Sequence, residues 1–194
     1  RLLSSVISAY GEPLLEETAK ETKPEKKHQN ISKKNYHLIT NEKEIDEWIN
    51  EAEEAGELAI DTETSSLDAH QTDLVGISLS TKIGKACYIP IGHKFKGCLK
   101  KETVIKKLKP LLEDKSVKKI GQNIKFDFIV LYKQGINMNS MEDTMLMSYV
   151  LDAGKNRHNM DTLSEIHLQH KTISFKEIVG TGKKEINFSD VELD

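Results

Sequence analysis

Cysteine, tryptophan and long apolar runs are all scarce in this chain of 194 residues. Its two cysteines, Cys87 and Cys98, show no C-x-x-C spacing and no metal-ligand pattern with the seven histidines. No apolar stretch approaches the roughly 20 residues that a membrane-spanning helix needs. No charged-then-apolar leader follows Arg1. We therefore expect a protein of a reducing, cytoplasmic compartment with no membrane partner.

An excess of charge of one sign is also missing. The formal net charge is −3, which argues against a protein that coats duplex DNA electrostatically. A small nucleic-acid site that carries its own metal ions stays possible. Hydrophobic residues make up 37% and charged residues 30% of the chain. This composition predicts one folded domain and a part that is too polar to fold.

The polar part is predicted at residues 16–34, where only Ala19 and Ile31 are apolar apart from one proline. Such a stretch buries too little surface to offset its ordering entropy, so we expect a charged flexible linker. An apolar patch precedes it and predicts either a frayed helix or, as we prefer, the end of a preceding domain. Arg1 in place of methionine suggests an internal cut in a longer protein, and we expect the folded domain to start at Tyr36.

From Tyr36 onward, helical and strand patterns alternate. Asn41 is a good N-cap with Glu44 as its capping partner, and the apolar spacing after it predicts a helix that ends at Gly56. Strands are predicted at residues 58–60, 74–80, 85–91 and 117–120. Helices are predicted around residues 104–112, 124–134, 144–151 and 163–167, the first of them bent by Pro110. The order predicts an α/β domain: a mixed sheet with an antiparallel N-terminal part, flanked by helices.

Two carboxylates directly follow the first buried strand. Asp61 and Glu63 are two residues apart, so on a strand their side chains point to the same side. Like charges this close are costly to bury unless a cation lies between them. Hard oxygen ligands favour Mg²⁺ or Mn²⁺ over zinc. The alternative is a solvated strand end, which is the commoner explanation for an isolated D-x-E.

A second polar cluster follows the strand at residues 117–120. Gly121 predicts a turn into a helix, and Asn123 and Asp127, four residues apart, are expected to share one helix face near its start. Asp127 could also serve only to complement the helix dipole. Because both clusters lie at predicted strand ends, one edge of the sheet would bring them together.

Five segments resemble one family of nucleases. Residues 59–68 and 121–127 resemble the first two motifs of the DEDD class of ribonuclease-H-like 3′–5′ exonucleases. Residues 142–149, 156–163 and 170–178 are similar to one branch, the proofreading exonuclease domain of bacterial DNA polymerase I, family A. The resemblance implies a ribonuclease-H-like fold and a 3′–5′ exonuclease domain over residues 36–194. Residues 1–35 would be the end of a 5′-nuclease domain plus the linker.

The resemblance also implies a site with two divalent ions, Mg²⁺ or Mn²⁺, roughly 3.5–4 Å apart. Asp61 would bridge both ions, Glu63 would hold the ion that generates the nucleophile, and Asp127 would serve the second ion. Asn123 would help to hold the substrate, and Thr62 would belong to the same substrate-binding region.

Further substrate contacts follow from the same resemblance. Leu67 would wedge against the terminal bases of a frayed 3′ end, or else anchor its loop to the core. Phe175 would stack on a base, although a core phenylalanine is the commoner case. Arg157 would contact a phosphate or form a surface ion pair. Asp143 also fits the family pattern, and we interpret it first as a helix N-cap.

The expected partners are a single-stranded or frayed 3′ end of DNA and the polymerase and 5′-nuclease domains of a monomeric bacterial enzyme. The family's third motif, Y-x-x-x-D, would lie beyond Asp194, because position 190 is Asp and not Tyr. We therefore expect residues 1–194 to be inactive alone. Two alternatives stay open: a non-catalytic scaffolding domain, and a ribonuclease D-like RNA exonuclease.

Overall fold

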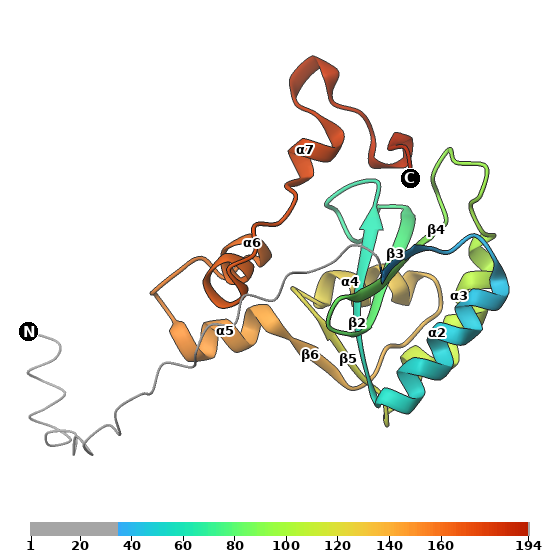
Figure 1. Cartoon of the computed structure of the whole chain (residues 1–194), viewed down its shortest axis with the longest axis horizontal. Helices are drawn as coiled ribbons and strands as arrows, with labels where there is room; N and C mark the ends of the chain where they lie inside the picture. The colour runs from blue at the N-terminus through green and yellow to red at the C-terminus, as the bar shows by residue number, and fades with distance from the viewer. Residues whose placement is uncertain (1–34, 194) are drawn as a thin grey trace, which may run out of the picture.

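A computed structural model describes residues 35–193 (Figure 1); the predicted linker and apolar patch lie outside them. Six strands form one sheet in the order β1-β4-β3-β2-β5-β6. The neighbours β2, β3 and β4 run antiparallel, whereas β1 with β4, β2 with β5 and β5 with β6 run parallel. The strands are β1 Tyr36–Leu38, β2 Glu57–Thr64, β3 Leu74–Lys82, β4 Lys85–Pro90, β5 Lys118–Gly121 and β6 Met141–Asp143. The mixed sheet with an antiparallel N-terminal part is confirmed.

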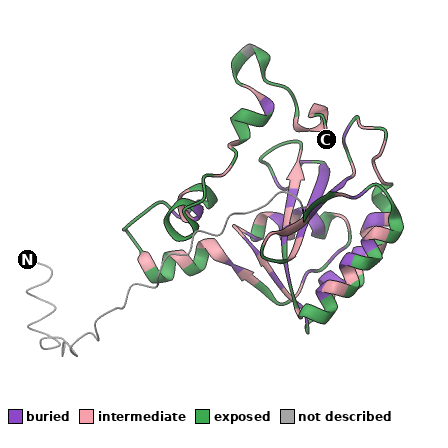
Figure 2. Cartoon of the chain, in the orientation of Figure 1, coloured by how far each residue is buried: buried purple, intermediate pink, exposed green. Residues whose placement is uncertain are grey.

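Helices flank this sheet. Figure 1 shows α2 and α3 side by side, and the two helices pack against each other. Buried residues concentrate in the strands and on the inner sides of these helices, while the C-terminal segments are more exposed (Figure 2). No helix within residues 35–193 is long and apolar enough to cross a membrane. The α-helices are α2 Glu42–Ala55, α3 Lys101–Glu113, α4 Lys125–Lys133, α5 Thr144–Asp152, α6 Met160–Leu163 and α7 Phe175–Val179.

Two of the three residues predicted to define the ends of α2 have the predicted role. The Asn41 side chain accepts a hydrogen bond from the backbone N–H of Lys43 at 3.0 Å, and Gly56 ends the helix with φ 69°. A positive φ is the conformation that glycine adopts at least cost. The predicted capping role of Glu44 is wrong, because its Oε2 is buried without a hydrogen-bond partner. One side-chain cap and the apolar face are sufficient to define this helix.

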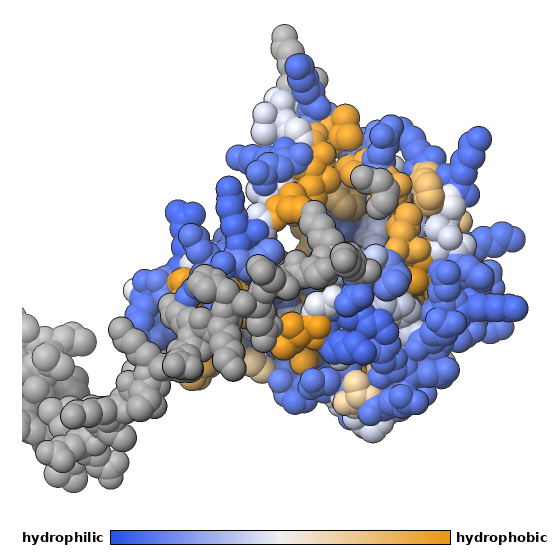
Figure 3. All heavy atoms as spheres, in the orientation of Figure 1, coloured by the Kyte–Doolittle hydropathy of each residue, from blue (hydrophilic) through white to orange (hydrophobic). Residues whose placement is uncertain are grey.

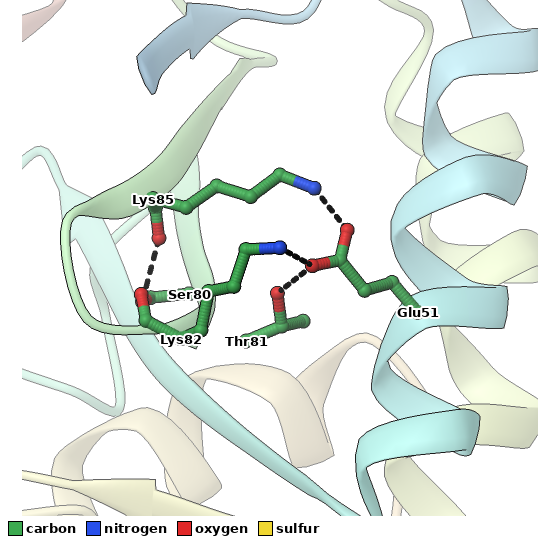
Figure 4. Close-up of polar contacts among 5 residues, drawn as sticks. All are labelled: Glu51, Ser80, Thr81, Lys82 and Lys85. Carbon is green, nitrogen blue, oxygen red and sulfur yellow. Dashed lines mark hydrogen bonds and ion pairs between the residues drawn. The ribbon is translucent and has the colours of Figure 1, made fainter. Parts of the chain in front are cut away.

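Glu51 joins α2 to the β3–β4 hairpin (Figure 4). Its carboxylate accepts a hydrogen bond from Thr81 Oγ1 at 2.8 Å, lies 3.4 Å from Lys82 Nζ, and pairs with Lys85 Nζ. These interactions lower the pKa of Glu51 to about 2, with the Lys85 hydrogen bond as the largest cause and the Thr81 hydrogen bond next. The hairpin is thereby fixed against the helix that covers its sheet.

Two other predictions need correction. β2 continues to Thr64, so Asp61 and Glu63 lie within the strand and not after it. The helix predicted around residue 163 is the short α6 followed by a π-helical turn, Ser164–Leu168. Pro110 lies inside α3, and the bend predicted there stays a prediction. The extension of β2 matters most, because a strand holds its side chains in alternating directions.

Candidate active site

The site is built on the last residues of β2. β5 pairs with β2 only up to Ala59, so the backbone N–H of Thr62 lies beyond the end of that ladder. Asp127 of α4 is the hydrogen-bond partner of this N–H. Its Oδ1 accepts one hydrogen bond from Thr62 N at 2.8 Å and another from Thr62 Oγ1 at 2.6 Å. Asp127 is only 2% exposed. The two polar clusters predicted from separate segments therefore meet, with Asp127 held beside the strand between Asp61 and Glu63.

The three carboxylates raise one another's pKa. Burial raises the pKa of Asp61 to about 6, and the charge of Glu63 adds to this. Burial raises the pKa of Glu63 as well, with a further contribution from Asp127. The pKa of Asp127 is also raised to about 6, mainly by burial, although the Thr62 hydroxyl opposes the shift. The site therefore holds negative charge that no cation within residues 35–193 neutralises.

The ligand atoms of this site match those of a divalent cation site, because carboxylate oxygens are the ligands that Mg²⁺ and Mn²⁺ prefer. However, no three Asp, Glu, His or Cys side chains of the described chain come together as a ready ligand group. Asp61, Glu63 and Asp127 would therefore supply part of an oxygen shell. Water, substrate phosphate or another carboxylate would have to complete it.

Asn123 lies in a different place from the one predicted. It precedes α4 and adopts a left-handed conformation with φ 61°, so it does not share a helix face with Asp127. Its backbone N–H donates to Asp143 Oδ1 at 2.9 Å, and its side-chain oxygen accepts from Lys125. Asp143 also caps α5 through Met145 N at 2.9 Å, which confirms the N-cap interpretation. One carboxylate thus fixes both the turn before α4 and the start of α5.

Three of the predicted substrate residues, Leu67, Phe175 and Arg157, are exposed, whereas Thr62 is buried at 6% exposure and Asn123 is half-buried. Leu67 is 96% exposed, so its alternative role as a core anchor is wrong. Phe175 is 54% exposed and stacks on Phe188, which excludes the core interpretation. Arg157 is exposed and forms no ion pair with any residue that the structure describes. Its neighbour His158 is buried and accepts, at its carbonyl oxygen, a hydrogen bond from Gln122 Nε2 at 2.7 Å.

The structure adds Tyr88 to this face of the sheet, a residue that sequence reasoning missed. Ser78 of β3 lies opposite both Asp61 of β2 and Tyr88 of β4, so these three residues form one cross-strand row. Residues that lie opposite each other point to the same face. The only available sequence signal was the tyrosine's position in a strand, which does not distinguish a site residue from a packing residue.

A hollow of about 710 Å³ opens beside Asp61. The sheet forms its floor with residues such as Ala59 and Ser78, and α5 and α6 contribute Met147 and Leu163 to its wall. Its lining is mainly apolar. The carboxylates therefore stand at the edge of a hollow with room for a further chain segment or ligand.

Comparisons with known proteins agree with this geometry. The 3′–5′ exonuclease family matches residues 36–191. DNA polymerase I of Rhizobium leguminosarum is 43% identical over 171 residues, covering 77% of this chain and 17% of that protein. DNA polymerase I of Pseudomonas aeruginosa is 40% identical over 165 residues, covering 82% of this chain and 18% of that protein. The chain thus spans less than a fifth of these relatives' lengths.

Solved structures support the fold. The Aedes aegypti Nibbler EXO domain superposes with a TM-score of 0.62 at 11% identity, covering 84% of each chain. Brucella melitensis NrnC with bound Mg²⁺ has a TM-score of 0.55 at 22% identity, covering 77% of this chain and 68% of that one. Together with the family match, the six-stranded sheet and the D-x-E strand joined to Asp127 lead to one conclusion. The chain belongs to the 3′–5′ exonuclease domain family of bacterial DNA polymerase I.

Proposed function

We propose that this domain removes nucleotides from the 3′ end of DNA as the proofreading module of a DNA polymerase. The observation that carries the proposal is the double hydrogen bond from Thr62 to Asp127, which fixes a third carboxylate beside Asp61 and Glu63. A purely structural domain has no need to hold three mutually repelling carboxylates at one strand end. Their presence therefore favours catalysis over scaffolding.

Divalent ions, Mg²⁺ or Mn²⁺, would activate a water molecule and stabilise the leaving oxygen when bound. Asp61 would contact both ions, Glu63 the ion that generates the nucleophile, and Asp127 the second ion. NrnC, a protein of the same fold, binds Mg²⁺, which supports the choice of a divalent ion. Thr62 holds the buried Asp127 in place, and burial keeps bulk water from screening the site.

Three exposed residues, together with Asn123, would hold the strand. Leu67 would press against the terminal base, Phe175 would stack on it, and Arg157 would contact a backbone phosphate. Asn123 would help to hold the substrate next to α4. The exposure of Leu67, Phe175 and Arg157 supports this role, because a residue that binds DNA must be reachable by it.

We also propose that residues 1–194 alone have little activity, because the described residues hold no complete ligand group for a metal ion. The wider enzyme would be a monomeric cytoplasmic protein in which a linker and a 5′-nuclease domain precede residue 36 and a polymerase domain is a further partner. The start of the family match at residue 36 supports that boundary.

The test compares matched and mismatched primer ends in the full-length polymerase chain with Mn²⁺. A mismatched terminus unpairs more easily, and unpairing costs a few kcal/mol, so it should be cleaved faster. Asp61→Asn is the matched control and should abolish cleavage without loss of folding. Equal rates on both primers would exclude proofreading. Faster cleavage of RNA than of DNA would favour the ribonuclease D-like alternative.

A further inference from the structure

Four aromatic rings form a continuous column between the face of Asp61 and the surface. Tyr88 and His93 meet edge to face with centroids 5.6 Å apart, and Tyr88 Oη lies 2.6 Å from His93 Nε2. His93 then meets Phe188 at 5.5 Å, and Phe188 stacks on Phe175 at 6.0 Å with an interplanar angle of 14°. We call Tyr88, His93, Phe188 and Phe175 the aromatic column.

The inner end of the aromatic column is fixed beside the carboxylates. Tyr88 lies in the cross-strand row of Asp61, and Gly76 lies opposite Glu63 in the next row. A Cβ added at Gly76 would come within 1.9 Å of Tyr88 Oη, so the tyrosine side chain crosses this glycine. The hydroxyl therefore lies over the row of Glu63, and burial and the charge of Glu63 both raise the pKa of Tyr88. Gly76 is the residue that leaves room for this arrangement.

The middle of the aromatic column consists of His93 and Phe188, and Phe188 is the first residue of the C-terminal turn η4, Phe188–Asp190. This turn is bonded to Lys94, the residue next to His93. Lys94 donates its backbone N–H to Ser189 O at 2.9 Å, and Lys94 Nζ pairs with Asp190 Oδ1 at 2.6 Å. The adjacent His93 is only 8% exposed. η4 itself packs beside β2. One side of the Phe188 ring is thus held against the buried ring of His93.

The outer end is Phe175, the first residue of the five-residue helix α7. Ser174 and Glu177 form a capping box at its start, and Ile186 N donates to Val179 O at 2.9 Å just after its end. Apolar side chains gather on the upper part of the face in Figure 3, where Figure 1 places α7 and the C-terminal turn. One side of the Phe175 ring rests on Phe188, and the ring is 54% exposed.

We propose that Phe188 and His93 are positioning residues that hold Phe175 as the stacking wall for the 3′-terminal base, an inference that rests on the proposed nuclease function. An exposed phenylalanine on a short helix would rotate among its rotamers and lose that freedom when a base binds. The stack on Phe188 restricts this freedom before the base binds, which is the general advantage of preorganisation. Phe188 and His93 act through Phe175 and do not touch DNA.

The test uses a single-stranded oligonucleotide whose 3′-terminal base is the fluorescent adenine analogue 2-aminopurine, with EDTA present so that no cleavage occurs. Stacking on an aromatic ring quenches this base, and residues 1–194 should bind and quench it. Phe175→Leu should weaken binding about tenfold and relieve the quench, as stacking energies of this kind predict. Phe188→Leu should have nearly the same effect. The double variant should be no weaker than Phe175→Leu, because both changes remove one contact.

Two variants control for folding and for the loss of an aromatic ring. Tyr132→Leu removes the outer ring of another stacked pair, Phe128–Tyr132, with centroids 5.8 Å apart, and should change neither affinity nor quench. Phe188→Tyr keeps the ring and should behave as the wild type. If Phe188→Leu does not fold, Asp190→Asn, which weakens only the ion pair with Lys94, should partly relieve the quench.

The outcomes separate the inference from the function on which it rests. If the wild type quenches the probe and Phe188→Leu quenches it equally, the positioning role alone is wrong. Additive losses in the double variant would mean that Phe188 contacts DNA directly, which also overturns it. If the wild type does not bind or quench the 3′-labelled strand, the inference fails, whereas the proposed nuclease function is decided separately by the cleavage of matched and mismatched primers.

Discussion

Thr62 donates two hydrogen bonds to a single oxygen of Asp127, at 2.8 Å from its backbone and 2.6 Å from its hydroxyl. The two residues are 65 positions apart, one on β2 and the other on α4. Both are buried. Hydrogen bonds to a buried carboxylate favour its charged form, so this pair opposes the burial that raises the pKa of Asp127. The contact joins the two motifs of the site into one unit.

Thr62→Val should therefore raise the pKa of Asp127 further above about 6. Valine keeps the shape and the backbone donor but removes the hydroxyl, and the free energy of unfolding should fall by about 1–3 kcal/mol. Carboxyl NMR titration and urea unfolding measure the two effects. Thr62→Ser keeps both donors and should leave the pKa unchanged. If the pKa of Asp127 is the same in Thr62→Val as in the wild type, the Thr62 hydroxyl does not stabilise the charged form of Asp127.

The free energy of unfolding should fall as pH rises from about 4 to about 6.5. The pKa of Asp61 rises from 3.8 in the unfolded chain to about 6 when folded. The folded state therefore binds more protons in this range, and stability decreases with increasing pH. A shift of this size corresponds to at most about 3 kcal/mol. Urea unfolding at pH 4.5 and pH 7.5 measures the change.

Asp61→Asn is the matched variant for this pH effect. An amide cannot titrate, so the variant should show a flatter pH profile and a higher free energy of unfolding than the wild type at pH 7.5. At pH 4.5, where Asp61 is protonated in the folded protein, the two proteins should be close. Parallel profiles of variant and wild type would show that Asp61 does not cause the pH dependence.

The sequence was sufficient to predict four of the six strands, β2 to β5, because these carry strong local signals, but it did not predict the three-residue edge strands β1 and β6. The alternation at residues 74–80 and the buried run at residues 58–60 correspond to β3 and to the centre of β2. The paired carboxylates Asp61 and Glu63 were also recognisable, since their spacing alone places them on one side of a strand. The hydrogen bond between Thr62 and Asp127 was not, because nothing local specifies which strand a helix start will meet.

Other features depend on tertiary contacts and left no local signal. Lys119 is fully buried and donates to the carbonyl oxygens of Asp114 at 2.5 Å and Val117 at 2.6 Å, although lysine ordinarily indicates a surface position. The left-handed conformation of Asn123 is stabilised by Asp143, twenty residues later. The stack of Phe175 on Phe188 joins segments whose patterns predict no particular partner.

Glu51→Gln should destabilise the fold through the β3–β4 hairpin. The charge of Glu51 pairs with Lys85 and Lys82, but the site is partly exposed, so water screens these pairs. We expect a loss of about 0.5–1 kcal/mol at pH 7. The pKa of Glu51 is lowered from 4.5 to about 2, so the contribution is present above pH 4.5 and disappears as pH falls toward 2. Urea unfolding in low and high salt should show a smaller loss in high salt.

Divalent ions should stabilise residues 1–194 only weakly, and only when the site is deprotonated. Binding needs charged carboxylates, and the pKa of Asp61 and of Asp127 is about 6. Mn²⁺ should therefore raise the melting temperature at pH 7.5 but not at pH 5, since protons compete for the same oxygens. Three carboxylates without a complete ligand group leave an unfilled octahedral shell, so saturation should require millimolar ion.

Calorimetric titration with Mn²⁺ at the two pH values measures this binding, and Asp61→Asn and Glu51→Gln are the matched pair of variants. Asp61→Asn should abolish the heat of binding, because it removes the carboxylate that would contact both ions. Glu51→Gln removes a carboxylate of α2 that pairs with lysines, so it should leave the titration unchanged. Two tight sites at pH 7.5 would contradict the prediction, since they would show that residues 1–194 already contain a full set of ligands. Equal binding at pH 5 and pH 7.5 would show that Asp61 and Asp127 are charged at both values, contrary to the raised pKa values that their burial produces.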